Sequence, residues 1–197
     1  MSEEQQVVLV RHGETEWSRE GRHTGRTDVP LTDTGRHQAE LLGRRLESWP
    51  LRAVLSSPLE RASETCRIAG LPMTGIRQDL CERDYGDVEG RTTSDIRRDR
   101  PGWSLWREGV GGGETAEAVG HRADRVITEV RQMPGDVALV AHGHLLRVLA
   151  ARWLDLPAVD GRLLVLSTAS VSVLGYEREI AVVRLWNDRS HLDDASA

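Results

Sequence analysis

The chain has 197 residues, of which 39% are hydrophobic and 29% charged, so it can bury a sizeable core and we expect one domain spanning residues 1–197. Its formal net charge of −5 opposes any general attraction to nucleic acid or to an anionic membrane surface. All 26 basic residues are arginine, so local clusters of them could still bind small anions.

Neither end of the chain nor its cysteines indicate export. Residues 1–6 are acidic and have neither the basic nor the apolar region of a secretory signal, and no run approaches the roughly 20 apolar residues of a membrane span. Cys66 and Cys81 lie in no C-x-x-C or zinc-type spacing, which favours two reduced core residues. We therefore expect a cytoplasmic protein.

The first predicted strand stops abruptly in polar residues. Val7 to Val10 is an apolar, mostly β-branched run, and it is followed at once by Arg11, His12 and Gly13. Arginine bonds planar oxyanions through a fixed fork, and histidine can be neutral and nucleophilic near pH 7. Taken alone, this pair is either a solvated strand end or part of a phosphate site.

The next segments are a polar loop, a helix and a second strand. The loop runs over 16–30, and Thr32 is a plausible N-cap of a helix that ends near residues 49–50. A strand at 52–56 runs directly into Ser57-Pro58-Leu59-Glu60, whose pattern predicts a capping box with proline at the first helical position.

The remaining half begins with an irregular segment at about 76–113, which we interpret as a loop-rich insertion. Trp103 and Trp106 in this insertion could form an apolar lid or could simply pack. Periodicity then predicts, in order, a helix at 114–132, a strand at 136–141, a buried helix at 145–154 and strands at 170–176 and 180–186.

Alternating strands and helices predict an α/β fold, a three-layer α/β/α sandwich around a mostly parallel sheet with an antiparallel edge. Ligands of such sheets bind beyond the carboxyl ends of the strands. Arg11 and His12 follow the first strand, the turn from Ser57 to Arg61 follows the second, and His142 follows the strand at 136–141. One crevice can collect all three.

These residue types suit a phosphomonoester, whose phosphoryl group carries about two negative charges. Arg11, Arg61 and a protonated His142 could surround its oxygens, and the first turn of the helix after Ser57 would add a partial positive charge. His12 is the better nucleophile, because the carbonyl of the following glycine turn can fix its ring and neighbouring arginines disfavour its protonation. Glu82 is our choice of acid for the leaving oxygen and of base for water.

Five ordered blocks resemble the successive motifs of the histidine phosphatase superfamily, in its phosphoglycerate mutase-like branch. The blocks are Arg11-His12-Gly13-Glu14-Thr15, Ser57 to Thr65, Glu82 to Gly90, Gly113-Glu114-Thr115 and His142-Gly143-His144. The resemblance implies that His12 becomes phosphohistidine, that Arg11, Arg61 and His142 hold the phosphoryl group, with Gly143 beside them, and that Glu82 is the proton donor and later the base. Thr24 would lie in the loop over the substrate, and neither metal nor other cofactor is implied.

Two departures from the family pattern affect the function. Many members carry asparagine where this chain has Ser18, and the asparagine side chain helps to bind phosphate; the side chain of Ser18 is shorter, which leaves its contribution to phosphate binding open. True mutases have a longer insertion with a lysine and paired arginines, whereas residues 90–114 are a short stretch and the chain has no lysine. Hydrolysis of a small phosphorylated metabolite, such as a sugar phosphate, is therefore favoured over mutase activity.

Other readings remain. A non-catalytic phospho-ligand binding protein would need neither His12 nor Glu82. A zinc site that uses His23 and His144 is opposed by the arginines around the crevice, so no metal is expected. The sequence leaves the substrate's identity and a possible homo-oligomer open.

Overall fold

A computed structural model describes residues 5–193, and its centre is one six-stranded sheet of order β3-β2-β4-β1-β5-β6. Neighbours among the first four strands of this order run parallel, β5 is antiparallel to β1, and β6 is antiparallel to β5. The predicted mostly parallel sheet with an antiparallel edge is confirmed. The strands are β1 (Val7–Arg11), β2 (Leu51–Ser56), β3 (Gly75–Ile76), β4 (Asp136–Ala141), β5 (Val171–Glu177) and β6 (Ile180–Asp188).

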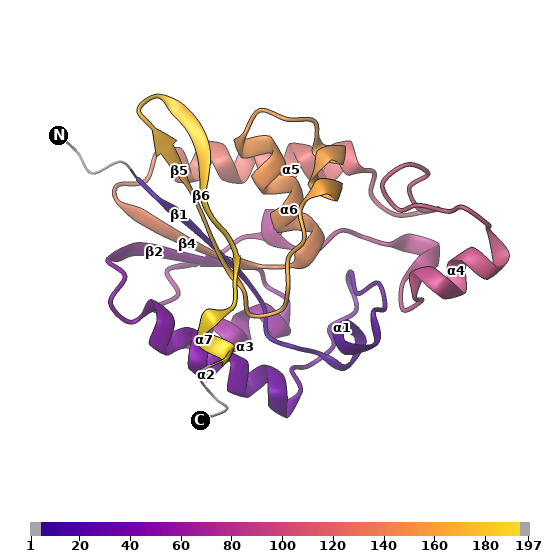
Figure 1. Cartoon of the computed structure of the whole chain (residues 1–197), viewed down its shortest axis with the longest axis horizontal. Helices are drawn as coiled ribbons and strands as arrows, with labels where there is room; N and C mark the ends of the chain where they lie inside the picture. Colours follow the sequence, from indigo (N-terminus) through magenta and orange to yellow (C-terminus); the bar gives the residue numbers. More distant parts are fainter. Residues whose placement is uncertain (1–4, 194–197) are drawn as a thin grey trace.

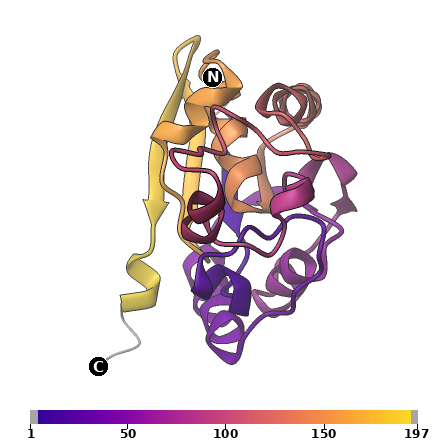
Figure 2. The ribbon, with the colours of Figure 1, turned by 90° about the vertical axis from the view of Figure 1, so that its right-hand side faces the viewer.

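Helices cover both faces of this sheet (Figures 1 and 2). The α-helices are α1 (Glu16–Glu20), α2 (Asp33–Leu46), α3 (Glu60–Ile68), α4 (Thr93–Asp99), α5 (Ala116–Arg131), α6 (Gly143–Trp153) and α7 (Ser190–Asp193). Short 3-10 turns occupy Gln78–Leu80, Gly86–Val88 and Ala158–Leu163. Within residues 5–193 no helix is both long and apolar enough to cross a membrane, and the acidic residues 1–4, part of the basis for the localisation prediction, lie outside the described range.

The alternation of side chains along β1 divides the core in two. Val7 and Leu9 belong to the apolar cluster that contains the buried faces of α5 and α6. Val8 and Val10 point the other way, into the cluster formed with α2 and α3. Because β1 places apolar side chains on both faces of the sheet, helices must cover both faces. The result is a three-layer structure.

The insertion has an apolar cluster of its own. It consists of Tyr85, Val88, Ile96, Trp103 and Leu105, and all five side chains are buried. With α4 it forms the part of the molecule that extends to the right of the sheet in Figure 1. The insertion is therefore rich in loops yet packed around its own small core, and the buried indole of Trp103 is a packing residue.

The helix starts were predicted with mixed success. Thr32 caps α2 as expected, since its side chain accepts a hydrogen bond from the amide of Gly35. The capping box at Ser57 is wrong, because α3 begins only at Glu60 and its N-cap residue has no capping side chain. Instead, both carboxylate oxygens of Asp28 accept from the Glu60 amide at 2.9 Å. The first amide of α3 is thus bound by a carboxylate from another segment.

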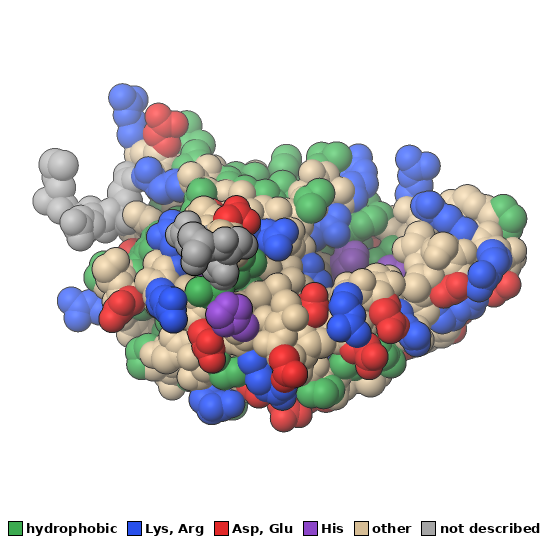
Figure 3. Space-filling model, turned by 60° about the horizontal axis from the view of Figure 1, so that its bottom comes forward, with side chains coloured by type: hydrophobic (Ala, Val, Ile, Leu, Met, Phe, Trp, Pro, Cys, Tyr) green, Lys and Arg blue, Asp and Glu red, His purple; other side chains and the backbone are tan. Residues whose placement is uncertain are grey.

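The surface carries charges of both signs. Figure 3 shows arginine and acidic side chains interspersed over one face, without a continuous basic area on that face. Cys66 and Cys81 are both buried and free, as the sequence predicted.

Candidate active site

The carboxyl ends of three parallel strands bring the predicted motifs together. Arg11 at the end of β1 lies opposite Ala141 of β4, and Ser56 of β2 lies opposite Val140. A cavity of about 190 Å³ adjoins these strand ends. Its walls are formed by Arg11, His12, Ser18, Gly21, Arg22, His23, Thr24, Glu82, Tyr85, Gly143, His144, Arg147 and Leu166. Six of the eight predicted site residues line this cavity, whereas Arg61 and His142 lie behind its wall.

His12 is buried and held in one tautomer. Its Nδ1 lies 2.7 Å from the carbonyl oxygen of Gly13, which can only accept, so Nδ1 carries the proton and donates. The lone pair is left on Nε2. Burial, followed by the positive charges of Arg61 and Arg11, lowers the pKa of His12 well below its ordinary value of 6.5. The ring is consequently neutral, as a nucleophile must be.

The turn after His12 requires glycine. A Cβ on Gly13 would lie 2.4 Å from the carbonyl oxygen of Gly35 in α2, which no side chain could tolerate. The amide of Gly13 donates to the hydroxyl of Thr65 at 3.0 Å, and that hydroxyl in turn donates to the Arg61 carbonyl. Packing against α2 and α3 therefore fixes the His12 turn.

Arg11 has hydrogen-bonding capacity left over. One terminal nitrogen donates to the carbonyl of Leu166 at 2.5 Å, but its Nε is buried without a hydrogen-bond partner among the described residues. A buried, unpaired N–H is costly, and the cost falls if an anion accepts from it. Because Arg11 lines the cavity beside His12, this donor is available to a phosphoryl oxygen.

Arg61 does not offer its guanidinium to the cavity. The side chain is fully buried, and it donates to the carbonyls of Thr27 and Gly25 at 2.9 and 2.8 Å and through Nε to Nδ1 of His142 at 3.2 Å. With these partners Arg61 anchors the loop that carries Thr24 and orients His142. The direct phosphoryl contact expected of Arg61 stays a prediction.

The contacts of His142 favour a neutral ring, whereas the protonated form was expected for a ring that holds a bound phosphate. Its Nδ1 accepts from Arg61 and its Nε2 lies 2.8 Å from the hydroxyl of Ser57. Burial and then the charge of Arg61 lower the pKa of His142 well below 6.5. Its ring centroid is 5.1 Å from that of His12, so the two histidines remain neighbours.

Glu82 is the carboxylate of the cavity wall. Its Oε1 accepts from the amides of Arg83 and Leu145 at 2.8 and 2.9 Å, and its Oε2 accepts from the amide of His144 at 3.0 Å. Two of these donors are free amides of the first turn of α6, a position that attracts a carboxylate. The other carboxylates of the motif are outside the cavity wall.

Those carboxylates have structural partners. Asp84 accepts from the Gly86 amide, Asp87 pairs with Arg100 at 2.6 Å, and Glu89 accepts from the amides of Gly25 and Thr27. These contacts give the three carboxylates structural roles and leave Glu82 as the candidate acid and base. The sequence alone could not make this distinction.

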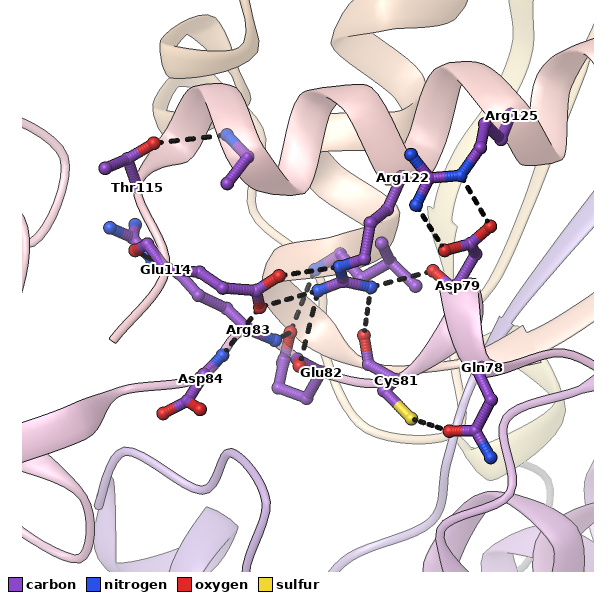
Figure 4. A network of polar contacts seen from close by, with 12 residues as sticks. Gln78, Asp79, Cys81, Glu82, Arg83, Asp84, Glu114, Thr115, Arg122 and Arg125 are labelled. Atoms are coloured by element: carbon purple, nitrogen blue, oxygen red, sulfur yellow. Dashed lines mark hydrogen bonds and ion pairs between the residues drawn. The ribbon is translucent and has the colours of Figure 1, made fainter. Parts of the chain in front are cut away.

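Arg122 of α5 holds the backbone around Glu82 (Figure 4). It donates to the carbonyls of Asp79, Cys81 and Glu82 at 2.8, 2.9 and 3.4 Å. It also forms a two-pronged ion pair with Glu114, at 2.7 and 2.8 Å. Glu114 in turn accepts from the amide of Asp84 at 2.9 Å. This network was not predicted, since nothing local marks Arg122 among the arginines of its helix.

Ser18 and Thr24 line the cavity, but their side chains are engaged locally. The Ser18 hydroxyl donates to the carbonyl of Thr15 and accepts from the amide of the same residue, both at 2.9 Å. The Thr24 hydroxyl lies 3.2 Å from the Arg22 carbonyl. The contribution of Ser18 to phosphate binding is thus limited by its role in capping α1.

Sequence reasoning left several polar lining residues without a role in the cavity, among them Tyr85, His144 and Arg147. The sequence did contain a signal for Arg147: it lies three residues after His144 on a helix that starts at the end of a strand. This spacing places both residues on one face of the helix. Within residues 5–193 no three His, Cys, Asp or Glu side chains are placed to hold a metal ion. Of the two tryptophans left open, neither indole lines the cavity.

Comparison with known proteins places this geometry in a family. A sequence model of the histidine phosphatase superfamily (branch 1) matches residues 7–189. The chain is 42% identical over 186 residues to an acid phosphatase of Mycobacterium tuberculosis, covering 91% of this chain and 92% of the relative. It is 33% identical to sedoheptulose 1,7-bisphosphatase of Saccharomyces cerevisiae, covering 76% and 67%.

Two further comparisons agree. A probable phosphoglycerate mutase GpmB of Salmonella choleraesuis is 33% identical, with 95% of each chain covered. The solved structure of a mycobacterial glucosyl-3-phosphoglycerate phosphatase superposes with a TM-score of 0.84 at 29% identity, covering 94% of this chain and all of the other (100%). The chain therefore belongs to the histidine phosphatase superfamily, branch 1.

Proposed function

We propose that the protein is a metal-independent phosphatase that hydrolyses a small phosphorylated metabolite through a phosphohistidine on His12. The observation that carries the proposal is one cavity lined by three residues: His12, whose Nε2 is unprotonated, Arg11, whose Nε has no hydrogen-bond partner among the described residues, and Glu82. These are a nucleophile, an oxyanion donor and a proton carrier. A phosphoric monoester hydrolase also agrees with the acid phosphatase and bisphosphatase relatives.

In the first step, Nε2 of His12 attacks phosphorus in line with the ester oxygen. A P–N bond forms, the P–O ester bond breaks, and protonated Glu82 gives its proton to the leaving oxygen. Arg11 neutralises charge on the phosphoryl oxygens, and the neutral His142 is close enough to contribute an N–H once a phosphate displaces Ser57.

In the second step, water attacks the phosphoryl group from the side that the leaving alcohol vacated. Glu82, now a carboxylate, takes a proton from this water, so inorganic phosphate forms and the P–N bond breaks. His12 returns to its neutral form with Nδ1 still donating to Gly13. The cycle consumes one water and restores every proton.

Mutase-type phosphoryl transfer is the second candidate, because a probable mutase is among the relatives. It would require the phosphoryl group to return to another hydroxyl of the bound product before water attacks. Incubation with 3-phosphoglycerate and trace bisphosphoglycerate separates the two, since steady formation of 2-phosphoglycerate without phosphate release would contradict the phosphatase proposal.

A screen of phosphorylated metabolites with phosphate detection, run in the presence of a chelator, tests the function. We expect release of phosphate from at least one small phosphomonoester in the chelator, and its loss in His12→Ala. Full activity of His12→Ala would show that the nucleophile is wrong. Ligand binding without any turnover by the wild type would favour a phospho-ligand binding protein instead. We also propose a cytoplasmic protein that binds neither nucleic acid nor membrane.

A further inference from the structure

The cavity contains more positive charge than one phosphoryl group needs. Its lining includes the arginines Arg11, Arg22 and Arg147 and a single carboxylate, Glu82. Arg22 is already paired with Glu20 at 2.6 Å on the surface. Arg11 serves the phosphoryl group in the function proposed above. Arg147 remains.

Arg147 has no carboxylate partner within 4.0 Å in the described part of the chain. Its Nε and one terminal nitrogen donate to the carbonyls of Gly161 and Arg162, at 3.0 and 3.4 Å, which fixes the guanidinium without neutralising it. The guanidinium lies over the indole of Trp106, 4.9 Å from the ring centroid. A half-buried cation that is fixed in place and lacks an acid partner is suited to bind an anionic ligand.

His144, one turn earlier on α6, presents a hydrogen-bond donor on the same helix face. The hydroxyl of Tyr85 lies 2.6 Å from Nδ1 of His144, and we assign the phenol as the donor and Nδ1 as the acceptor because the phenol has no other acceptor among the described residues. Burial lowers the pKa of His144 well below 6.5 and raises that of Tyr85 well above 10, so both groups are neutral. The ring proton of His144 is therefore on Nε2, which has no partner within residues 5–193.

The indole of Trp106 packs against both residues without lining the cavity. Its indole contacts the ring of His144 at a centroid distance of 5.0 Å as well as the guanidinium of Arg147. His144 and Arg147 are three residues apart and so share a face of α6, about 5 Å apart along its axis. The amide of His144 also donates to Glu82, so His144 and Arg147 lie beside the residue that carries the proton for the leaving oxygen.

We propose that His144 and Arg147 form a second anion subsite, which selects substrates whose leaving group carries a carboxylate or a second phosphate. The inference rests on the proposed phosphatase function, because it concerns the alcohol half of the same substrate. Arg147 supplies the charge, His144 supplies an N–H with a fixed direction, and Tyr85 acts as a positioning residue that holds the tautomer of His144.

The test compares substrates that differ in the second anion alone. One pair is 3-phosphoglycerate and glycerol 3-phosphate, and the other is fructose 1,6-bisphosphate and fructose 6-phosphate. In at least one pair, we expect the wild-type kcat/KM to be at least about 10-fold higher for the compound that carries the second anion. This factor corresponds to one charge-assisted hydrogen bond. The pair with the larger ratio identifies whether the second anion is a carboxylate or a phosphate.

Variants then locate the effect. In Arg147→Met the ratio of the two kcat/KM values should fall by about 10-fold or more. Arg147→Lys should give a ratio between those of the wild type and Arg147→Met, because lysine keeps the charge but loses the planar fork. Arg152→Met is the matched control on the same helix. Arg152 is paired with Asp124 at 2.8 Å and lies outside the cavity, so the ratio should stay within about twofold of wild type.

Tyr85→Phe provides a readout that a merely structural role would not move. Loss of the phenol should allow the Nδ1-protonated tautomer of His144, visible in ring ¹⁵N shifts, and should lower the same ratio. A ratio near one in the wild type, or an unchanged ratio in Arg147→Met, overturns the subsite and leaves the phosphatase function standing. Failure of the wild type to release phosphate from any of the four compounds or from the wider screen overturns the function and the subsite together.

Discussion

At the scale of single residues, the site depends on which ring nitrogens carry protons. Nδ1 of His12 donates to the carbonyl of Gly13, and Nδ1 of His142 accepts from Nε of Arg61. Each ring is therefore held in one neutral tautomer. The two rings lie next to each other yet are prepared for different tasks: His12 offers a lone pair and His142 an N–H. The residue types were evident in the sequence, whereas the tautomers follow only from contacts with residues distant in the chain.

The first prediction concerns the acid side of the pH profile. Because the pKa of His12 lies well below 6.5, acidification from pH 8 to pH 6 should leave its ring neutral and able to attack. In the ligand-free protein, the ¹³C and ¹⁵N ring resonances assigned by comparison with His12→Ala should not titrate over this range. A midpoint near 6.5 would mean that burial and the arginines do not act as described.

The second prediction concerns Ser18. Since its hydroxyl is engaged with Thr15, Ser18→Ala should raise KM for a phosphorylated substrate by less than about threefold. A direct phosphate contact is worth about 1.5–3 kcal/mol, so its loss would raise KM by more than about 10-fold. Steady-state kinetics of the single variant distinguish the two results.

At the scale of elements, the site depends on helices that hold segments far away in sequence. Two arginines of α5 reach the segment that carries Glu82: Arg122 through a largely buried fork, and Arg125 through an exposed pair with Asp79. The side chains of the first pair are 13% and 18% exposed, against 59% and 32% for the second. Water screens the exposed pair far more, so the two contacts should differ in strength.

The third prediction follows from this contrast. Arg122→Met leaves the Glu114 carboxylate and three backbone carbonyls without their donor, and it should lower the free energy of unfolding by about 3 kcal/mol. Arg125→Met removes an exposed pair with the same segment, and it should lower the free energy of unfolding clearly less than Arg122→Met does. Denaturant unfolding of both variants checks the difference, and equal losses would contradict the assigned role of Arg122.

The fourth prediction concerns the start of α3. Asp28→Ala removes the carboxylate that accepts from the Glu60 amide, and it should cost about 1 kcal/mol of stability. Asparagine can still accept from this amide, so Asp28→Asn should lose only a few tenths of a kcal/mol. Thermal unfolding of the pair provides the measurement. An alanine variant as stable as the asparagine variant would show that the cap contributes nothing.

At the scale of the whole molecule, the sequence was sufficient to predict the parallel strands and the polar residues that follow their carboxyl ends. Apolar runs at Val7 and Val137 predict two parallel strands, and residues that directly follow them, Arg11, His12 and Gly143, line the cavity. The start of α3 was mispredicted because a distant carboxylate, Asp28, replaced the local cap. The partners of Arg61 could not be predicted either, because Thr27, Gly25 and His142 lie on other segments. In both cases a long-range contact replaced the local rule.

The central claim, a phosphohistidine on His12, can be tested by rapid quenching with ³²P-labelled substrate. Since Nδ1 of His12 donates to Gly13, the wild type should yield an acid-labile, base-stable label on Nε2 of the peptide that contains His12. The label should be absent from His12→Ala and should persist longer in Glu82→Gln, which cannot activate water. An equal base-stable label in His12→Ala would contradict the account.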